Sequence, residues 1–279
     1  MTLATLTDVL GPALRQGYAV PGLVCLGWED MRAYVLAAQA ERAPVILQAG
    51  PSCRAHTPLP VLGTMFRHLA DSVDVPVVAH LDHGASVAEC RAALQVGVSS
   101  VMIDGSRLDL AQNIALTAEV ARMAHDAGAS CEGEIGFVGY AGGEASAGTD
   151  PEEAALFAHE TGVDAMAVSV GNVHLQQGTG GGLDLPRLRA IEARTQVPLV
   201  IHGGSGVSVA DRAALAAGSQ ICKFNFGTEL RMVFGAALRQ AVTTHPDWFD
   251  RIAILKETHL PIFGAACLVF QGVGASGRV

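Results

Sequence analysis

The chain has 279 residues, 50% of them hydrophobic, and a formal net charge of -9. This acidic balance excludes a broad nucleic-acid surface, because binding to a phosphate backbone requires clustered lysines and arginines. The N-terminus lacks the basic start and apolar run of a secretory signal, and we expect no apolar stretch close to the roughly 20 residues that span a bilayer. The six cysteines are scattered, which fits a reducing compartment. We therefore expect a cytoplasmic protein that binds neither nucleic acid nor membrane.

Apolar strand-like runs alternate with amphipathic helical runs along the chain. Strands are predicted at residues 19–26, 45–49, 75–80, 100–103, 130–134, 165–170, 198–201 and 220–226. Helices are predicted at residues 29–42, 59–72, 87–96, 108–127, 152–161, 185–194, 209–217 and 229–244, with a helix and a tail in 246–279. This alternation predicts an α/β protein, a (β/α)8 barrel with a C-terminal helical tail, formed by one domain over residues 1–279. An open doubly wound sheet is the alternative, with a site where the strand order reverses.

Reactive side chains follow the predicted strands at their carboxyl ends, where such barrels carry their active sites. They are Asp82 and His83 after the third strand, Asp104 after the fourth, Glu132 and Glu134 at the end of the fifth, His174 beyond the sixth, His202 after the seventh and Asn225 in the eighth. Each one alone is explained as well by capping or packing. Scattered structural residues, however, would not all select the same rim of the barrel.

Three of these residues have the side chains and spacing of a metal site. His83, His174 and His202 come from different strand ends, so they could converge only at the mouth of the barrel. Three protein ligands and an open fourth position are typical of catalytic zinc. Asp82 precedes His83 directly and would lie beside the metal, in position for proton transfer. His80 is interpreted as a supporting residue.

Two glycine-rich turns follow the last two predicted strands. The residues concerned are Gly203, Gly204 and Ser205 after the seventh strand, and Asn225, Gly227 and Thr228 at the eighth. Each turn leads into a helix, whose first backbone N–H groups bind anions well. Together the two turns predict a cradle for one phosphate group.

With these segments in place, the chain resembles the class II, metal-dependent ketose-bisphosphate aldolases, which include the fructose- and tagatose-bisphosphate enzymes. The resemblance rests on VPVVAHLDHG, GVSSVMIDGS, CEGEIG, TDPEEAALFAHETGVDAMAVSVG, PLVIHGGSGV and KFNFGTEL, which occur in family order within residues 17–231. The short length and the segment NFGTEL look closer to the tagatose-type branch.

The resemblance implies reversible cleavage of a ketose 1,6-bisphosphate-like sugar phosphate to dihydroxyacetone phosphate and an aldehyde. Zinc on His83, His174 and His202 would stabilise the enediolate as a Lewis acid. Asp104 and Glu134 match carboxylates near the metal, and Glu134 matches one that can ligate the ion in an alternative position. Asp82 would take the proton from the C4 hydroxyl group. The phosphate cradle described above would hold the dihydroxyacetone-phosphate half, with room for a monovalent cation nearby, and the protein would form a homodimer or homotetramer.

Several positions depart from the family pattern. Leu175 stands where the family has glycine after the second histidine, and Val24 aligns with a family asparagine. In the loop after the fifth strand only Glu144 is available to protonate the enediolate carbon. Arg278 is the one candidate for a second phosphate, reaching a neighbouring subunit, and it fits equally well as an exposed arginine near a chain end.

These departures leave other functions open. The aldehyde half could be non-standard, or the substrate could carry a single phosphate. Lys223 alternates with Asn225 and would point into the barrel, where it could form a Schiff base or an ion pair with Glu132 or Glu134. A zinc-dependent hydrolase and a non-catalytic relative that binds sugar phosphates are the remaining alternatives.

Overall fold

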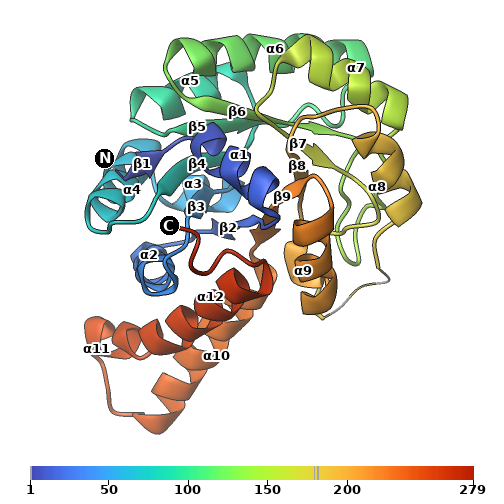
Figure 1. Ribbon diagram of the computed structural model, residues 1–279. Coiled ribbons are helices and arrows are strands. Elements are labelled where there is room, and N and C mark those ends of the chain that lie inside the picture. Colours follow the sequence, from blue (N-terminus) through green and yellow to red (C-terminus); the bar gives the residue numbers. More distant parts are fainter. Residues whose placement is uncertain (1, 179, 181) are drawn as a thin grey trace.

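The computed structural model describes residues 2–178, 180 and 182–279, and within them eight parallel strands close into a ring surrounded by helices (Figure 1). Neighbouring strands pair in sequence order, and β9 pairs with β2 to close the ring. The predicted (β/α)8 barrel is therefore confirmed. Its strands are β2 (Val20–Val24), β3 (Val45–Ala49), β4 (Val77–Gly84), β5 (Ser100–Ile103), β6 (Ser130–Ile135), β7 (Ala165–Val168), β8 (Leu199–Ile201) and β9 (Ile221–Phe226).

Helices follow these strands, and most of them cover the outside of the ring (Figure 1). They are α2 (Trp28–Glu41), α3 (Pro51–His56), α4 (Leu59–Asp71), α5 (Val87–Gln95), α6 (Leu110–Asp126), α7 (Pro151–Thr161), α8 (Leu185–Glu192), α9 (Val209–Gly218) and α10 (Thr228–Thr244). Most agree with the predicted helices to within a few residues. Asp150 accepts hydrogen bonds from the N–H groups of Glu152 and Glu153, and with Pro151 at the first helical position it starts α7.

The N-terminal segment is the main element that the sequence analysis did not predict. A short strand, β1 (Leu3–Ala4), pairs with the start of β4, and α1 (Leu6–Gln16) contacts β2, β6 and β9. Thr5 and Asp8 hydrogen-bond reciprocally to each other's backbone N–H, which forms a capping box and was the signal available in the sequence. Helix α1 thereby covers the amino-terminal end of the barrel (Figure 1).

The C-terminal segment forms an arm beside the barrel (Figure 1), made of α10, α11 (Arg251–Lys256) and α12 (His259–Gly272). By length and composition alone, residues Arg251–Gly272 could cross a membrane, and one 18-residue window within them has a mean hydropathy of 1.5. The expectation that no apolar stretch approaches this length is therefore wrong. The segment is interrupted between its two helices, and α12 packs against α2 and α10. Only 22% of its most apolar window is buried, and Ile252, Leu260 and Leu268 are exposed.

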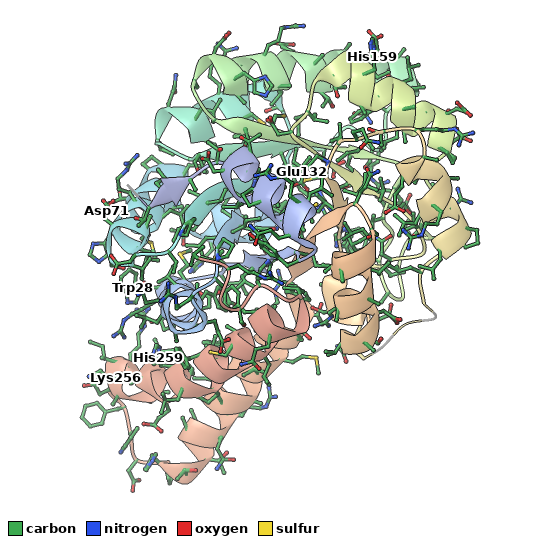
Figure 2. The ribbon with its side chains drawn as sticks, in the orientation of Figure 1. Trp28, Asp71, Glu132, His159, Lys256 and His259 are labelled. Atoms are coloured by element: carbon green, nitrogen blue, oxygen red, sulfur yellow. The ribbon has the colours of Figure 1, made fainter. Side chains whose placement is uncertain are left out.

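The interior of the barrel contains charged side chains as well as aliphatic ones. Glu132 on β6 is labelled inside the ring in Figure 2, and it is fully buried together with Lys223 and His80. Lys223 Nζ donates to Glu132 Oε2 at 2.6 Å. Because a buried charge is strongly unfavourable without a partner, this pairing is what allows both groups inside the barrel. A polar layer thus supports the carboxyl end of the strands from below.

Strand β4 is longer than predicted and differs at its end. It runs to Gly84 instead of ending at His80, so Asp82 and His83 belong to the strand. Its register with β5 shifts between Leu81 and Gly84, and His83 adopts a left-handed backbone with φ of 51°. A bulge of this kind re-aims side chains at a barrel rim. The backbone therefore directs His83 differently from a regular strand.

Candidate active site

The three predicted histidines meet at the carboxyl end of the barrel. The ring centroids lie 5.4 Å apart for His83 and His174, 4.8 Å for His83 and His202, and 5.5 Å for His174 and His202. The nitrogens that each can offer lie within 4.8 Å of one another. Because zinc binds imidazole nitrogen at about 2.0–2.1 Å, one ion can reach all three after small side-chain adjustments.

The hydrogen bonds of two histidines leave one nitrogen of each for an ion. His83 Nδ1 donates to Asp104 Oδ2 at 2.8 Å, and His202 Nε2 donates to Glu132 Oε1 at 3.1 Å. His202 Nδ1 is buried and has no hydrogen-bond partner among the described residues. When a histidine binds a metal through one ring nitrogen, a hydrogen bond from the other ring nitrogen fixes its tautomer and ring orientation. The donor set therefore fits a metal ion, with His83 Nε2 and His202 Nδ1 as ligand atoms.

The two predicted carboxylates, Asp104 and Glu134, lie next to the three histidines. Glu134 Oε2 is 3.3 Å from His202 Nδ1 and 3.9 Å from His83 Nδ1, and it is also buried without a hydrogen-bond partner in the described part of the chain. Asp104 is held by His83 and by the Ser106 hydroxyl, which donates at 2.6 Å. His83, Asp104 and Glu134 form a second group with ligand spacing. Glu134 could therefore ligate an ion in place of one histidine.

The charges around these histidines are strongly coupled. Burial, together with repulsion from His202 and His83, lowers the pKa of His174 to about 3. Burial also acts to lower the pKa of His202, but its hydrogen bond to Glu132 and the negative charge of the nearby Glu134 raise it to about 10. A divalent cation at this point would replace the proton that these carboxylates hold on His202. The buried carboxylates Glu132 and Glu134 therefore favour a positive charge at His202, carried either by a proton or by a bound cation.

Asp82 lies beside this group and faces the cavity. Burial alone would raise the pKa of Asp82, but the neighbouring His83 and His202 lower it below its usual value. Its Oδ1 atom is buried and makes no hydrogen bond to the described residues. An ionised carboxylate with a free oxygen can accept a proton from a ligand in the cavity.

Arg54 on α3 holds the end of β4 in place and was missed by the sequence analysis, which interpreted this segment as a loop. Its guanidinium donates to the carbonyl oxygens of Ala49 at 2.6 Å, Asp82 at 2.6 Å and His83 at 2.9 Å. It also forms an ion pair with Glu89 at 2.8 Å. Pro51 at the helix start was the available signal for α3, but nothing local in the sequence indicates these long-range contacts.

The predicted phosphate cradle opens onto the same space. A cavity of about 390 Å³ is lined by Asp82, His83, His174, Gly203, Ser205, Asn225, Gly227 and Thr228, among others. Gly204 is buried and is not among the residues that line this cavity. Gly203 has a φ of 68°, and a Cβ added there would lie 2.1 Å from the carbonyl oxygen of Val173. Only glycine fits this turn, so the backbone can approach a ligand closely.

Leu175 and Tyr140 form another part of the cavity wall. Leu175 is half-exposed and has a left-handed backbone with φ of 57°, which glycine adopts without strain. Tyr140 stacks on His174 with ring centroids 5.0 Å apart, and His174 N–H donates to the carbonyl oxygen of Gly139 at 2.8 Å. The sequence analysis did not single out Tyr140, because a lone aromatic residue in a loop has no distinguishing spacing.

Three other predicted candidates lie elsewhere. Glu144 is exposed and pairs with Arg107 at 2.6 Å, outside the cavity. Arg278 lies over the ring of Tyr18 at 5.0 Å, beside the amino end of β2 and opposite the histidines. Lys223 pairs with Glu132 below the histidines, which is the ion-pair alternative considered from the sequence.

Known proteins resemble the chain over nearly its whole length. Residues 4–276 match the family model for fructose-bisphosphate aldolase class II. The structure of the YdjI aldolase from Escherichia coli K12 has 29% sequence identity and a TM-score of 0.86, and the match covers 99% of each chain. Fructose-bisphosphate aldolase from Campylobacter jejuni shares the fold with 19% identity and a TM-score of 0.85, over 99% of this chain and 97% of that one. The chain belongs to the class II fructose-bisphosphate aldolase family.

Proposed function

We propose that this aldolase is zinc-dependent and reversibly cleaves a phosphorylated ketose to dihydroxyacetone phosphate and an aldehyde. One observation carries the proposal: a single cavity of about 390 Å³ brings together two of the three clustered histidines, the Asp82 carboxylate and the glycine-rich turns. The third histidine, His202, is packed against the other two. An aldol cleavage needs these three functions within the reach of one small sugar phosphate.

The metal would be held by His83, His174 and His202, with Glu134 as an alternative ligand and Asp104 orienting His83. A divalent ion at this position would act as a Lewis acid toward the ketone oxygen and stabilise the charge that develops there. Glu132 positions His202 through its Nε2 hydrogen bond, and Lys223 keeps Glu132 ionised. The protein would thus fix the ligand geometry from beneath.

The substrate would be held at its phosphate end by the cradle. Backbone N–H groups at Gly203, Ser205 and the start of α10 would contact phosphate oxygens, and a positive helix end favours the anion. The side chains of Asn225 and Thr228 line the same space and could bind the hydroxyl groups of the dihydroxyacetone-phosphate half. This anchoring would place the C3–C4 bond near Asp82.

Asp82 would accept the proton of the C4 hydroxyl group while the C3–C4 bond breaks. The C4 oxygen then becomes the aldehyde carbonyl, and the bonding electron pair moves toward the ketone-bearing fragment. That fragment must finally gain a proton at carbon. Two loop residues compete for this step: Glu144, which lies outside the cavity, and Tyr140, which lines it.

The alternatives are less well supported by the contacts. A Schiff base requires an unprotonated amine, whereas Lys223 is fully buried against the Glu132 carboxylate at 2.6 Å. A hydrolase would use the same ligands but gives no role to a phosphate cradle. Four other expectations stay predictions. They are assembly as a homodimer or homotetramer, a monovalent cation near the cradle, a single domain and a cytoplasmic location.

The test is aldol cleavage measured by release of dihydroxyacetone phosphate from fructose 1,6-bisphosphate, tagatose 1,6-bisphosphate and fructose 1-phosphate. We expect cleavage of at least one substrate, loss after dialysis against a chelator, and recovery with zinc. Cleavage that survives metal removal would refute the metal mechanism. Trapping by borohydride would then identify a Schiff base, and tight binding without cleavage of any substrate would favour a non-catalytic role.

A further inference from the structure

We infer that the aromatic ring of Tyr140 positions His174 as a metal ligand, and that metal binding in turn stabilises the loop that carries Tyr140. This loop, the β6–α7 hairpin, comprises residues 137–147 between β6 and α7. The role rests on the proposed metal site, and it concerns residues that do not themselves bind the ion. It also separates the function of the Tyr140 ring from any function of its hydroxyl group.

His174 differs from the other two histidines in how its ring is held. His83 Nδ1 donates to Asp104 and His202 Nε2 donates to Glu132, so a carboxylate orients each of these rings. The ring nitrogens of His174 form no ion pair and no hydrogen bond with the residues that the structure describes. An imidazole without such a partner can rotate away from an ion. The orientation of His174 must therefore come from packing.

The ring of Tyr140 supplies this packing. Its centroid lies 5.0 Å from that of the His174 ring, and the two planes are inclined by 27°. Both side chains line the active-site cavity. Stacked aromatic rings attract each other beyond the area that they bury. Because the phenol ring covers one face of the imidazole, it restricts the rotation of His174 and takes the place of the carboxylate that the other two histidines have.

The backbone of His174 is tied to the same hairpin. Its N–H donates to the carbonyl oxygen of Gly139 at 2.8 Å, and its carbonyl oxygen accepts from the N–H of Ala141 at 2.9 Å. Tyr140 lies between these two residues and forms an isolated parallel bridge with His174. Both the side chain and the backbone of His174 thus depend on the hairpin being closed over it.

The β6–α7 hairpin is built to move as one unit. Phe137 and Ala147 pair across its base, with N–H donations at 2.8 and 2.9 Å in the two directions. The Ser146 hydroxyl accepts from the Gly139 N–H at 2.9 Å and donates to the carbonyl oxygen of Asn172 at 3.2 Å. Ser146 therefore joins the two sides of the hairpin and attaches them to the segment before His174.

The other contacts of the hairpin are weak. Residues 140–145 at its tip are exposed. Arg107 lies over the Phe137 ring at 4.3 Å and pairs with Glu144 at 2.6 Å, but both charged side chains are more than half exposed, so these contacts contribute little. Such segments open locally at low free energy. Opening would remove the support of His174, so hairpin closure and metal affinity are coupled, and this coupling acts in both directions.

The first measurement is the dissociation constant for zinc, determined by competition between the metal-free protein and a chromophoric chelator. Tyr140→Leu removes the aromatic ring and should weaken zinc binding about 10-fold, as expected when a group that orients a metal ligand is lost. Tyr140→Phe keeps the ring and should bind zinc within about twofold of the wild type. Phe249→Leu makes the same kind of change at an aromatic residue that is 96% exposed, and it should leave zinc affinity unchanged.

The second measurement is amide hydrogen exchange with and without zinc. In the wild type, zinc should slow exchange in peptides that cover residues 137–147, whereas a peptide from α5 should not change. In Tyr140→Leu this protection of the hairpin should be largely lost. Ser146→Ala loosens the hairpin without changing either aromatic ring, and it should also reduce both the protection and the zinc affinity. It therefore provides the test if Tyr140→Leu fails to fold.

The outcomes distinguish this role from the proposed function. A wild type that binds zinc, together with unchanged zinc affinity in Tyr140→Leu, would refute the role of Tyr140 and leave the proposed function intact. Equal weakening in Tyr140→Phe and Tyr140→Leu would show that the hydroxyl group acts instead of the ring, and exchange that does not respond to zinc would refute the coupling. A wild type that binds no zinc would refute the proposed metal site and this role with it.

Discussion

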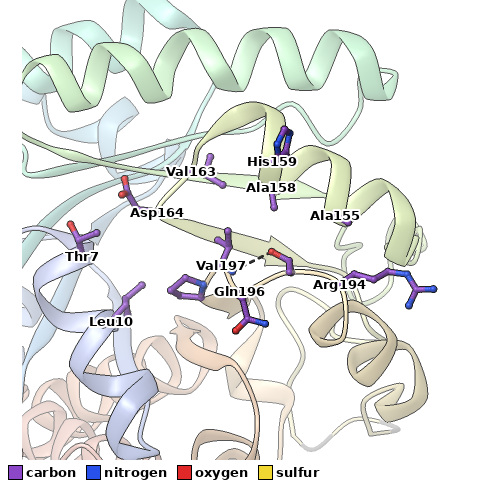
Figure 3. Close-up of a pocket in the computed structure, with 13 residues that line it drawn as sticks. Thr7, Leu10, Ala155, Ala158, His159, Val163, Asp164, Arg194, Gln196 and Val197 are labelled. Atoms are coloured by element: carbon purple, nitrogen blue, oxygen red, sulfur yellow. Dashed lines mark hydrogen bonds between the residues drawn. The ribbon is translucent and has the colours of Figure 1, made fainter.

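The two ends of the barrel each carry a cavity, and the larger one is not at the candidate site. At the amino-terminal end a cavity of about 500 Å³ lies between α1, α7 and the segment before β8. Figure 3 shows Thr7 and Leu10 facing Ala158, Gln196 and Val197 across it. At the carboxyl end the active-site cavity has about 390 Å³. Volume alone would therefore select the wrong end.

The difference lies in how the polar groups are satisfied. In the amino-terminal cavity, Arg194 pairs with Glu152 at 2.6 Å, and Asp164 accepts hydrogen bonds from His125 and the Cys131 N–H. None of its described lining residues has a buried side-chain atom without a partner. At the carboxyl end such atoms occur on Asp82, Asn225, His202, Glu134 and Arg231. Because buried polar groups are nearly always paired, this cluster indicates where ligands bind.

The largest expected difference between the two ends is in catalysis. Asp82→Asn should lower kcat about 1000-fold, because a proton acceptor at the reacting centre is lost while the shape is kept. The variant should still bind one zinc ion, measured by metal analysis after dialysis. Arg194→Met in the amino-terminal cavity is the matched control and should keep wild-type kcat. Asp82→Asn with more than a third of wild-type kcat would remove the role assigned to Asp82.

The polar layer beneath the histidines should matter mainly for stability. Lys223→Met leaves Glu132 buried without its cation, and should lower the free energy of unfolding by about 3–5 kcal/mol. Urea unfolding of the zinc-free protein measures this. The double variant with Glu132→Gln should recover part of the loss, because the uncompensated charge is gone. A cost below about 1 kcal/mol for Lys223→Met would contradict the importance of the ion pair.

The contact between Arg54 and Glu89 should give a smaller, pH-dependent effect at the same rim. Burial acts to raise the pKa of Glu89, but hydrogen bonds from Arg54 and the Ala85 N–H lower it below 4.5. A carboxylate with a lowered pKa in the folded state stabilises the fold above its unfolded pKa, and this stability is lost as pH falls through the folded value. Glu89→Gln should therefore cost about 1 kcal/mol at pH 7.

The pH profile of unfolding is the check on that prediction. Wild type and Glu89→Gln should converge in stability once the pH falls below the lowered folded pKa of Glu89, because Glu89 is then protonated in both the folded and unfolded states. A constant difference between pH 7 and pH 3 would show that the substitution acts through packing instead of charge.

The smallest expected effect concerns the loop after β6. Glu144 is more than half exposed and pairs with Arg107 at 2.6 Å, so Glu144→Gln should change kcat less than threefold and leave Tm unchanged. Tyr140→Phe keeps the ring that stacks on His174 but removes the hydroxyl group, and it should lower kcat more than Glu144→Gln. A tenfold or larger loss in Glu144→Gln alone would assign the carbon protonation to Glu144.

Several features of the site follow from local sequence patterns. The alternation of apolar strands and amphipathic helices predicted the barrel, and parallel strands in a closed ring carry their carboxyl ends on one rim. That geometry is enough to bring His83, His174 and His202 together from distant segments. Helix α1 was also accessible to this reasoning through the capping pair Thr5 and Asp8, although it was not predicted.

Other features depend on contacts between residues far apart in the chain. Arg54 reaches the carbonyl oxygens at the end of β4, and Glu132 on β6 orients His202 on a different strand. The register shift of β4 against β5, which changes the direction of the His83 side chain, depends on the pairing of these two strands. None of these pairings has a fixed sequence spacing, so no periodicity or motif could indicate them.

The sequence by itself thus determined the barrel, the rim that carries the reactive residues and the set of three histidines. These depend on hydrophobic periodicity and strand order, which are written along the chain. The tertiary structure decided which nitrogen each of His83 and His202 leaves for an ion, which carboxylate is balanced by Lys223, and which cation faces the cavity unpaired. Those properties are set by hydrogen bonds and charges between residues that are close in space but far apart in the sequence.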